Sequence, residues 1–216
     1  MLRDCKPLLL NWLTYKFLSF ILIPVIFLYS YMNEVNSMHY TKTTNMILCA
    51  VFAAITGVSA GLMLPLPFTP VPITLSTLAV MLTGALLGGW YGSASMIVYL
   101  LLGIFGAPVF SGYTGGFDKL IGPTGGYLAG YILTAFITGI IIEKMNKKNN
   151  LYINVLAMAL GLSACYVLGT LWYMFSTGTP LWTALISCVF PFLIGDALKI
   201  AVAAVLASKL RPAMHR

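Results

Sequence analysis

Long stretches without any charged side chain are the feature that most restricts how this chain can fold. None of the 75 residues between Lys42 and Asp118 is charged, and none of the 47 residues between Lys148 and Asp196 is charged. About 20 apolar residues suffice for a helix to cross a bilayer, so several spans fit into these gaps. Only 8% of the 216 residues are charged, whereas an ordinary soluble domain has about 25%. The chain is therefore predicted to be an all-α integral membrane protein in a lipid bilayer.

Apolar runs between turn signals predict six transmembrane helices. The second and third are short, and the tight turn "LGGWYG" between them predicts a hairpin that is tilted or shielded by its neighbours. The outer loops between the helices are expected to form a ligand pocket. The six helices are placed at residues 46–64, 75–88, 90–105, 126–143, 151–175 and 191–210.

The positions of the basic residues indicate how the helices are oriented. The net charge is +7, but most Lys and Arg residues lie at the ends of apolar segments and do not form a patch for nucleic acid. Positive residues mark the cytoplasmic side, which places both ends of the six-helix domain on the inner face of the cell membrane. The basic residues that support this orientation are Lys42, Lys144, Lys147, Lys148, Lys209, Arg211 and Arg216.

Four charges do not fit this orientation rule and are therefore candidates for function. Asp118 and Lys119 lie in an outer segment, while Asp196 and Lys199 lie inside the last predicted helix. Spaced i and i+3, the latter two share one helix face. A charge at bilayer depth costs roughly 2.5–3.5 kcal/mol, and two interpretations of keeping both are open. Either the pair neutralises itself during insertion, or its carboxylate and ammonium clamp a neutral ligand that donates and accepts hydrogen bonds.

Residues 1–37 form an extension that is separate from the six-helix domain, residues 38–216. Basic residues precede its apolar stretch "FLSFILIPVIFLYSYMN" and Glu34 follows it, which would put the far end outside and conflict with Lys42 being inside. Two interpretations are open: an extra apolar N-terminal helix, or a mis-assigned start with the product beginning at Met38.

Two outer segments have compositions that disfavour a regular helix. Residues 64–74, "LPLPFTPVPIT", contain four prolines and are expected to form a stiff extended loop, either a connector or a lid over a cavity. Residues 106–130 are rich in glycine but contain no GxxxxGK(S/T) pattern, so ATP binding by this chain is not predicted. This glycine-rich segment either packs as a turn, with Asp118 and Lys119 in solvent, or lines a cavity. Its candidate lining residues are Ser111, Tyr113, Asp118, Thr124 and Tyr127.

Small residues recur at four-residue spacing on the first predicted helix. Ala50 and Ala54 form one pair, and Ala53, Gly57 and Gly61 form a second row. Faces of this kind let helices approach closely. The pattern therefore predicts either packing within the bundle or the docking of another membrane subunit on Ala50 and Ala54.

The cysteine pattern gives no sign of a metal site. Cys49, Cys165 and Cys188 lie within or beside apolar helices, and the chain has no CxxC and no Cys/His cluster with metal-ligand spacing. No metal and no cofactor are expected.

Five ordered motifs within residues 42–212 carry a family resemblance. They read "PFTPVPIT", "GAPVFS", "LIGPTGGYLAG", "YVLGTLW" and "PFLIGDALK". With them the chain resembles the BioY family, the biotin-specific substrate-binding components (S-components) of energy-coupling factor (ECF) vitamin transporters. The resemblance implies a six-helix membrane protein that takes up biotin with high affinity. Its implied partners are a transmembrane scaffold subunit and two ATPase subunits.

The resemblance also implies roles for single residues. The Asp and Lys of the family's last motif contact the biotin ring system, which corresponds to Asp196 and Lys199 here. Biotin suits this pair because its ureido group offers N–H donors to a carboxylate and a carbonyl oxygen to an ammonium. Where many members of the family have Gln, this chain has Ser76. The arginines of the domain, Arg211 and Arg216, lie at its predicted cytoplasmic end, which leaves Lys119 or backbone N–H groups of the glycine-rich segment for the biotin carboxylate. The rest of the pocket is expected to comprise Tyr113, Thr124, Tyr127, Tyr166 and Trp172.

Two alternative functions compete with biotin uptake. An S-component for another small vitamin would share the topology and the glycine-rich segment. A membrane-embedded enzyme would need metal-binding carboxylates or a nucleophile beside a base, and the bundle offers three acids and no histidine. The sequence therefore favours a transporter component over an enzyme.

A chain that begins at Met38 is expected to insert into membranes and bind ligand as well as the full chain does, because the six-helix topology closes without residues 1–37. Membrane-fraction yield and equilibrium ligand binding of the two versions provide the test. Lost binding in the shorter chain would contradict the expectation.

Overall fold

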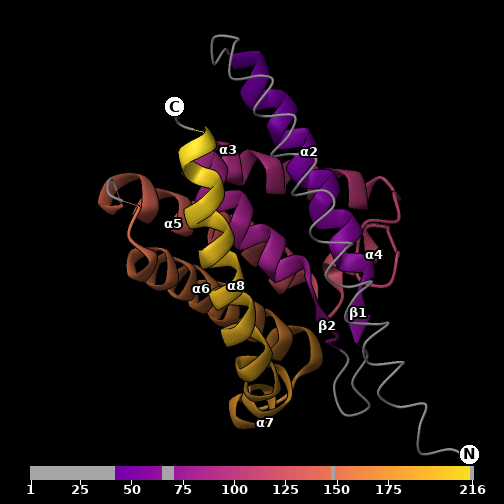
Figure 1. The fold of residues 1–216 in the computed structure, drawn as a ribbon. Coiled ribbons are helices and arrows are strands. Elements are labelled where there is room, and N and C mark those ends of the chain that lie inside the picture. The colour runs from indigo at the N-terminus through magenta and orange to yellow at the C-terminus, as the bar shows by residue number, and fades with distance from the viewer. Residues whose placement is uncertain (1–41, 65–70, 147–148, 215–216) are drawn as a thin grey trace, which may run out of the picture. The chain divides into compact units, whose positions relative to one another are not determined.

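The described part of the chain folds into seven helices and one short antiparallel ribbon. The computed structural model describes residues 42–64, 71–146 and 149–214; the predicted extension at 1–37 lies outside these ranges, as does most of the proline-rich loop, residues 65–70. In chain order the elements are α2 (Lys42–Gly61), β1 (Met63–Leu64), β2 (Ile73–Thr74), α3 (Ser76–Ile104), α4 (Asp118–Ile121), α5 (Gly125–Met145), α6 (Leu151–Thr177), α7 (Leu181–Cys188) and α8 (Phe190–Met214) (Figure 1).

Five of these helices, α2, α3, α5, α6 and α8, are long and apolar enough to cross a membrane. The chain is thus a helical membrane protein, as predicted. The helices predicted at 126–143, 151–175 and 191–210 match α5, α6 and α8 within a few residues at each end. The predicted end of the first helix at residue 64 is wrong, because α2 stops at Gly61 and the chain continues into β1, which pairs with β2.

Helix α3 contains a break where the sequence predicts a hairpin turn. Gly88 has φ 82° and ψ −177°, which is outside helical geometry. A side chain here would be strained, and an added Cβ would lie 1.8 Å from Glu143 Oε1. The segments before and after Gly88, residues 76–87 and 89–104, are about 18 and 24 Å long at 1.5 Å per residue. Both are shorter than the hydrocarbon core of about 30 Å, as the prediction of short, shielded helices requires.

Helix α5 lies between α3 and α6, while α2 packs on α3. Helices α3 and α5 approach backbone to backbone at Gly139 of α5, where an added Cβ would lie 2.3 Å from backbone atoms of Gly88 and Gly89. Aromatic rings fill the core beyond this crossing, with Tyr99 edge-on to Phe110 at a centroid distance of 5.7 Å. The bundle is therefore packed by backbone contact at the Gly139 crossing and by aromatic rings around Tyr99 and Phe110.

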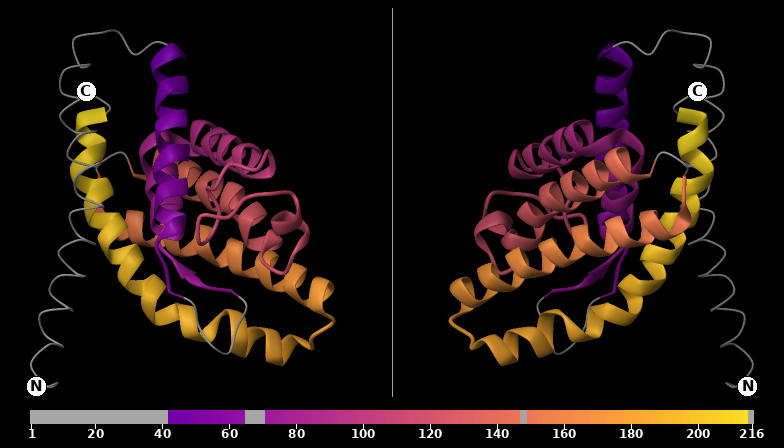
Figure 2. Two further views of the ribbon diagram at one scale, coloured as in Figure 1. Left: turned by 90° about the vertical axis from the view of Figure 1, so that its right-hand side faces the viewer. Right: turned by 90° about the vertical axis from the view of Figure 1, so that its left-hand side faces the viewer.

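Helices α6 and α8 are joined at one end by α7, as Figure 2 shows. The sequence prediction missed α7. Its residues follow Pro180, which takes the N-cap position with φ −68° and ψ 153°, so the helix starts again after the end of α6. Ala184 and Cys188, one turn apart, are its buried side chains. With only eight residues, α7 is too short to produce a hydropathy signal of its own.

Gly139→Ala is expected to destabilise the protein by about 1–3 kcal/mol, because the added methyl group meets backbone that cannot move aside. Gly195→Ala is the matched control, since Gly195 is also helical but has nothing within 4 Å of an added Cβ. There, alanine should stabilise the helix by up to about 1 kcal/mol. Thermal unfolding in detergent measures both variants. Equal melting temperatures would show that the crossing is not tight.

Candidate ligand-binding site

A buried ion pair on α8 is the centre of the candidate site. Lys199 Nζ lies 2.7 Å from Asp196 Oδ1, and the two residues are 8% and 3% exposed. Their i, i+3 spacing places both on the face of α8 that points into the bundle. Burying two charges costs several kcal/mol per ion unless further hydrogen bonds satisfy them. The site must therefore provide partners from other elements.

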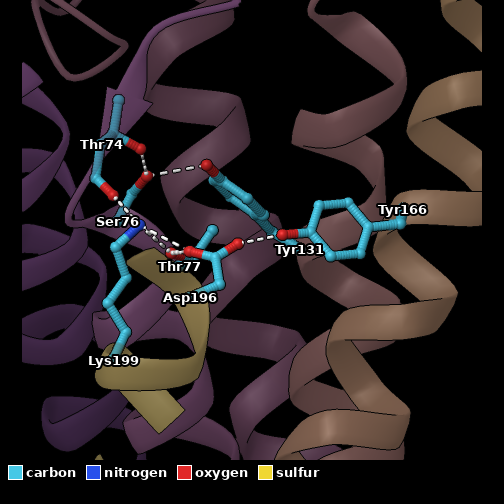
Figure 3. A network of polar contacts seen from close by, with 7 residues as sticks. All are labelled: Thr74, Ser76, Thr77, Tyr131, Tyr166, Asp196 and Lys199. Carbon is cyan, nitrogen blue, oxygen red and sulfur yellow. Dashed lines mark hydrogen bonds and ion pairs between the residues drawn. The ribbon is translucent and has the colours of Figure 1, made fainter. Parts of the chain in front are cut away.

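The ammonium of Lys199 has three hydrogen-bond acceptors, which is the number of its N–H groups. Besides Asp196 Oδ1, these are the carbonyl oxygen of Thr74 at 2.7 Å and Thr77 Oγ1 at 3.2 Å. Both threonines come from the region where β2 leads into α3 (Figure 3). The lysine thus connects α8 to a segment more than 120 residues earlier in the chain.

The carboxylate of Asp196 is held from two sides. Tyr166 of α6 donates its hydroxyl to Oδ2, and Thr77 Oγ1 lies 3.5 Å from Oδ1. Figure 3 shows the Tyr166 ring extending from α6 towards the carboxylate, opposite the lysine. Hydrogen bonds to charged groups contribute about 1.5–3 kcal/mol each, so these contacts offset part of the desolvation cost.

A chain of hydroxyl groups continues from this centre to α5. Thr74 Oγ1 lies 2.5 Å from Ser76 Oγ, which lies 2.7 Å from the hydroxyl of Tyr131. Ser76 is therefore a buried link between the ribbon and α5. The chain of contacts leads from Lys199 through the Thr74 backbone to the ring of Tyr131 (Figure 3).

Two cavities adjoin the network. The inner cavity, about 50 Å³, touches the ion pair itself. The outer cavity, about 340 Å³, extends towards the glycine-rich segment. The inner one is lined by Val71, Pro72, Thr74, Thr77, Tyr127, Tyr131, Leu162, Cys165, Tyr166, Cys188, Phe192, Asp196 and Lys199. The outer one is lined by Met63, Val71, Pro72, Thr74, Phe110, Ser111, Gly112, Thr114, Lys119, Thr124, Tyr127, Leu128 and Tyr131.

The cavities share part of their walls, and this shared part joins them into one candidate site. Val71, Pro72, Thr74, Tyr127 and Tyr131 line both. The hydroxyl of Tyr127 also lies 3.4 Å from the carbonyl oxygen of Cys188 at the end of α7. The charged head of the site therefore lies next to a larger space, with these side chains between the two.

Most residues that the sequence singled out lie along these two cavities. Ser111, Lys119, Thr124 and Tyr127 line the outer cavity. Tyr166 and the ion pair line the inner cavity. The two neighbouring charges of the glycine-rich segment differ: Lys119 is half-buried, whereas Asp118 is exposed and lines a separate hollow of about 250 Å³ with Lys119 and Thr124.

Besides Asp118, two predicted residues do not line either cavity. Tyr113 is 55% exposed, has a positive φ of 56°, and lies against Gly61 at the end of α2. Trp172 donates its indole N–H to the Gly122 carbonyl at 3.0 Å and packs on Gly126. Trp172 therefore connects α6 to the glycine-rich segment and does not line the cavities.

Sequence reasoning missed Thr74, Thr77 and Tyr131 as site residues. Thr74 belongs to the motif "PFTPVPIT", but its contribution is a backbone carbonyl, which no residue type announces. Thr77 reaches Lys199, and Tyr131 reaches Ser76, only because α3, α5 and α8 converge. Among the described residues, no group of His, Cys, Asp and Glu could hold a metal ion.

The predicted small-residue rows of α2 differ in burial. Ala53 is 1% exposed, and Gly57 packs against Val109, so this row points into the bundle. Ala50 and Ala54, which lie next to this row on the helix surface, are exposed. The described remainder of the chain therefore leaves these two alanines accessible.

Comparisons with known proteins agree with the motifs. A family model described as the BioY family matches residues 32–216. A probable biotin transporter BioY from Pyrococcus horikoshii is 34% identical over 170 residues, covering 79% of this chain and 98% of its own length. A biotin transporter BioY from Thermotoga maritima is 37% identical over 166 residues, covering 77% and 95%.

A solved structure has the same fold. It is described as the S-component for biotin from an ECF-type ABC transporter, and it superimposes with a TM-score of 0.74 at 31% sequence identity. The similarity covers 79% of this chain and 92% of that structure. Fold and sequence therefore point to the same group of proteins.

Proposed function

Because this chain belongs to the BioY family, we propose that it binds biotin at the outer side of the cell membrane, as the S-component of an ECF transporter. The observation that carries the proposal is the buried ion pair of Asp196 and Lys199 beside a cavity. Two charges kept at bilayer depth are costly, and a ligand that uses both gives a reason to keep them.

The ureido group of biotin matches the ion pair atom by atom. Its N–H groups donate to the carboxylate of Asp196, and its carbonyl oxygen accepts from the ammonium of Lys199. Tyr166 supports this arrangement, since it donates to the Asp196 oxygen that Lys199 leaves free. The competing interpretation, a pair that only neutralises itself, explains the 2.7 Å contact equally well but gives no role to the adjoining cavities.

The outer cavity suits the remainder of biotin. Its volume of about 340 Å³ lies in the range of small-molecule sites, about 300–1,000 Å³. Apolar walls such as Val71 and Leu128 fit the valeryl chain, while Lys119 provides a cation for the carboxylate, with Ser111 and Thr124 as further hydrogen-bonding groups. Asp118, Tyr113 and Trp172 lie outside both cavities and stay predicted site residues.

We further propose six membrane crossings with both ends of the domain in the cytoplasm. The two segments of α3 on either side of Gly88 count as separate crossings, which raises the five long helices to six. The positions of Lys42, Lys144 and Arg211 then agree with the positive-inside rule.

The partners that we propose are a transmembrane scaffold subunit and two ATPase subunits. The exposed face of α2 around Ala50 and Ala54 suits the scaffold, because small side chains let a second helix approach closely. An S-component for another small vitamin stays the alternative. Membership of a family of transporter components decides against the enzyme alternative.

Asp196→Asn and Lys199→Met are each expected to weaken biotin binding at least about tenfold, which corresponds to roughly 1.4 kcal/mol. Each removes one charge-assisted hydrogen bond to the ureido group, while removing a charge lowers the cost of membrane insertion. Calorimetric titration of biotin into the purified variants measures the effect. Glu143→Gln, an exposed acid at the inner end of α5, is the control and should leave affinity unchanged.

The double variant Asp196→Asn with Lys199→Met separates the two interpretations of the pair. A ligand clamp predicts that its affinity stays low. A pair that only neutralises itself predicts unstable single variants and a double variant that recovers both stability and affinity. Near-parental biotin affinity in the double variant would therefore refute the clamp, and lack of biotin binding by the parent would favour another vitamin.

Ala50→Leu and Ala54→Leu are expected to leave biotin affinity intact but to reduce co-purification with the scaffold subunit, because a bulky residue separates closely packed backbones. Ala201→Leu is the matched control, since Ala201 is an exposed alanine on a different span. Equal co-purification of all three variants with the parent would argue against docking on this face of α2.

A further inference from the structure

The ammonium of Lys199 has no N–H group left over for a ligand. Its three acceptors are Asp196 Oδ1, the Thr74 carbonyl and Thr77 Oγ1. A ligand carbonyl can therefore accept from this ammonium only by replacing one of them. Which acceptor yields depends on how strongly each is bound and on what happens to it afterwards.

The distances identify Thr77 as the acceptor that yields. The contacts to Asp196 and to the Thr74 carbonyl are both 2.7 Å, and the first is between opposite charges. The contact to Thr77 is 3.2 Å and involves a neutral hydroxyl. Charge-assisted bonds of short length are the stronger ones, so the bond to Thr77 is the weakest of the three.

Thr77 also has an alternative partner once Lys199 releases it. Its oxygen lies 3.5 Å from Asp196 Oδ1, so its O–H can donate to the carboxylate whether or not the lysine uses its lone pair. Thr77 lines the inner cavity and is only half-buried, which places it where a ligand carbonyl would enter. The Thr74 carbonyl, by contrast, is fixed in the backbone of the ribbon.

We propose that Thr77 is a placeholder for the ligand: its hydroxyl occupies, in the empty site, the hydrogen-bonding position on Lys199 that the carbonyl oxygen of a cyclic urea takes on binding. This inference rests on the proposed function for the identity of the ligand. Thr77 keeps the buried ammonium fully paired when the site is empty, and it competes with the ligand for the same N–H group. It therefore stabilises the free protein and limits affinity.

The stability of the ligand-free protein tests the first half of the proposal. Thr77→Val should lower the melting temperature, because it leaves a buried donor of Lys199 unpaired, while Thr77→Ser should melt like the parent. Thr83→Val is the matched control: it removes a buried hydroxyl of the same helix that bonds only within the helix, to the Ala79 carbonyl at 2.7 Å.

A neutral background ties any loss of stability to the lysine. In a chain carrying Asp196→Asn and Lys199→Met, Thr77→Val should cost no more stability than Thr83→Val does. An equal loss in the parent and in the neutral background would overturn the proposal, because Thr77 would then act only through packing. This measurement needs no ligand, so it stands even if the protein fails to bind biotin and the proposed function falls.

Affinity tests the second half, and its direction separates a placeholder from an ordinary contact residue. Thr77→Val should bind biotin about 3- to 10-fold more tightly than the parent, because the 3.2 Å bond that competes with the ligand is lost and only the 3.5 Å contact to Asp196 is lost from the complex. Desthiobiotin, which has the same cyclic urea without the sulfur ring, should gain by the same factor. Unchanged or weaker binding of both compounds would overturn the placeholder role.

Discussion

The fold is organised around the need to pair two charges that are buried inside an apolar helix. Asp196 and Lys199 neutralise each other, but an ammonium and a carboxylate together have more hydrogen-bonding capacity than one mutual contact can use. The remaining capacity is satisfied by groups from β2, from the first turn of α3 and from α6. These elements are far apart in sequence, so the pair connects parts of the chain that local structure does not bring together. The proposed ligand site is thus also a structural connection between helices.

The helix crossings determine where this connection can form. α5 approaches α3 at Gly139 without an intervening side chain, and the break at Gly88 lets α3 turn back beside itself. With these backbones close together at the crossing, the start of α3 and the first half of α5 converge away from it, where Tyr131 meets Ser76. The small residues at the crossing therefore let the helices approach closely enough for the hydroxyl groups at the site to reach one another.

Hydropathy and charge predicted the long helices and the turn near Gly88 and singled out Asp196 as a candidate, because each depends on chain-local properties: apolar length, a glycine pair, or a charge inside an apolar segment. The structure brought several predicted polar residues to the two cavities, yet it left Tyr113 exposed. Aromatic residue type alone cannot tell whether a loop directs a ring into a cavity or out of it. Thr77 was missed for a related reason, since a threonine in the first turn of an apolar helix is unremarkable until another helix places a lysine 3.2 Å away.

The two cavity volumes set a condition on how biotin would reach the ion pair. About 50 Å³ is room for a few water molecules, whereas the fused bicyclic head of biotin is larger, so binding at the pair requires the inner cavity to widen. The walls that both cavities share include Val71 and Pro72, on the chain segment that leads into β2. That segment is bound to α8 through the bond from Lys199 to the Thr74 carbonyl. Any outward movement of this wall therefore acts on the same ammonium to which the ligand is proposed to bind, so the proposed function couples ligand entry to the hydrogen bonding of Lys199.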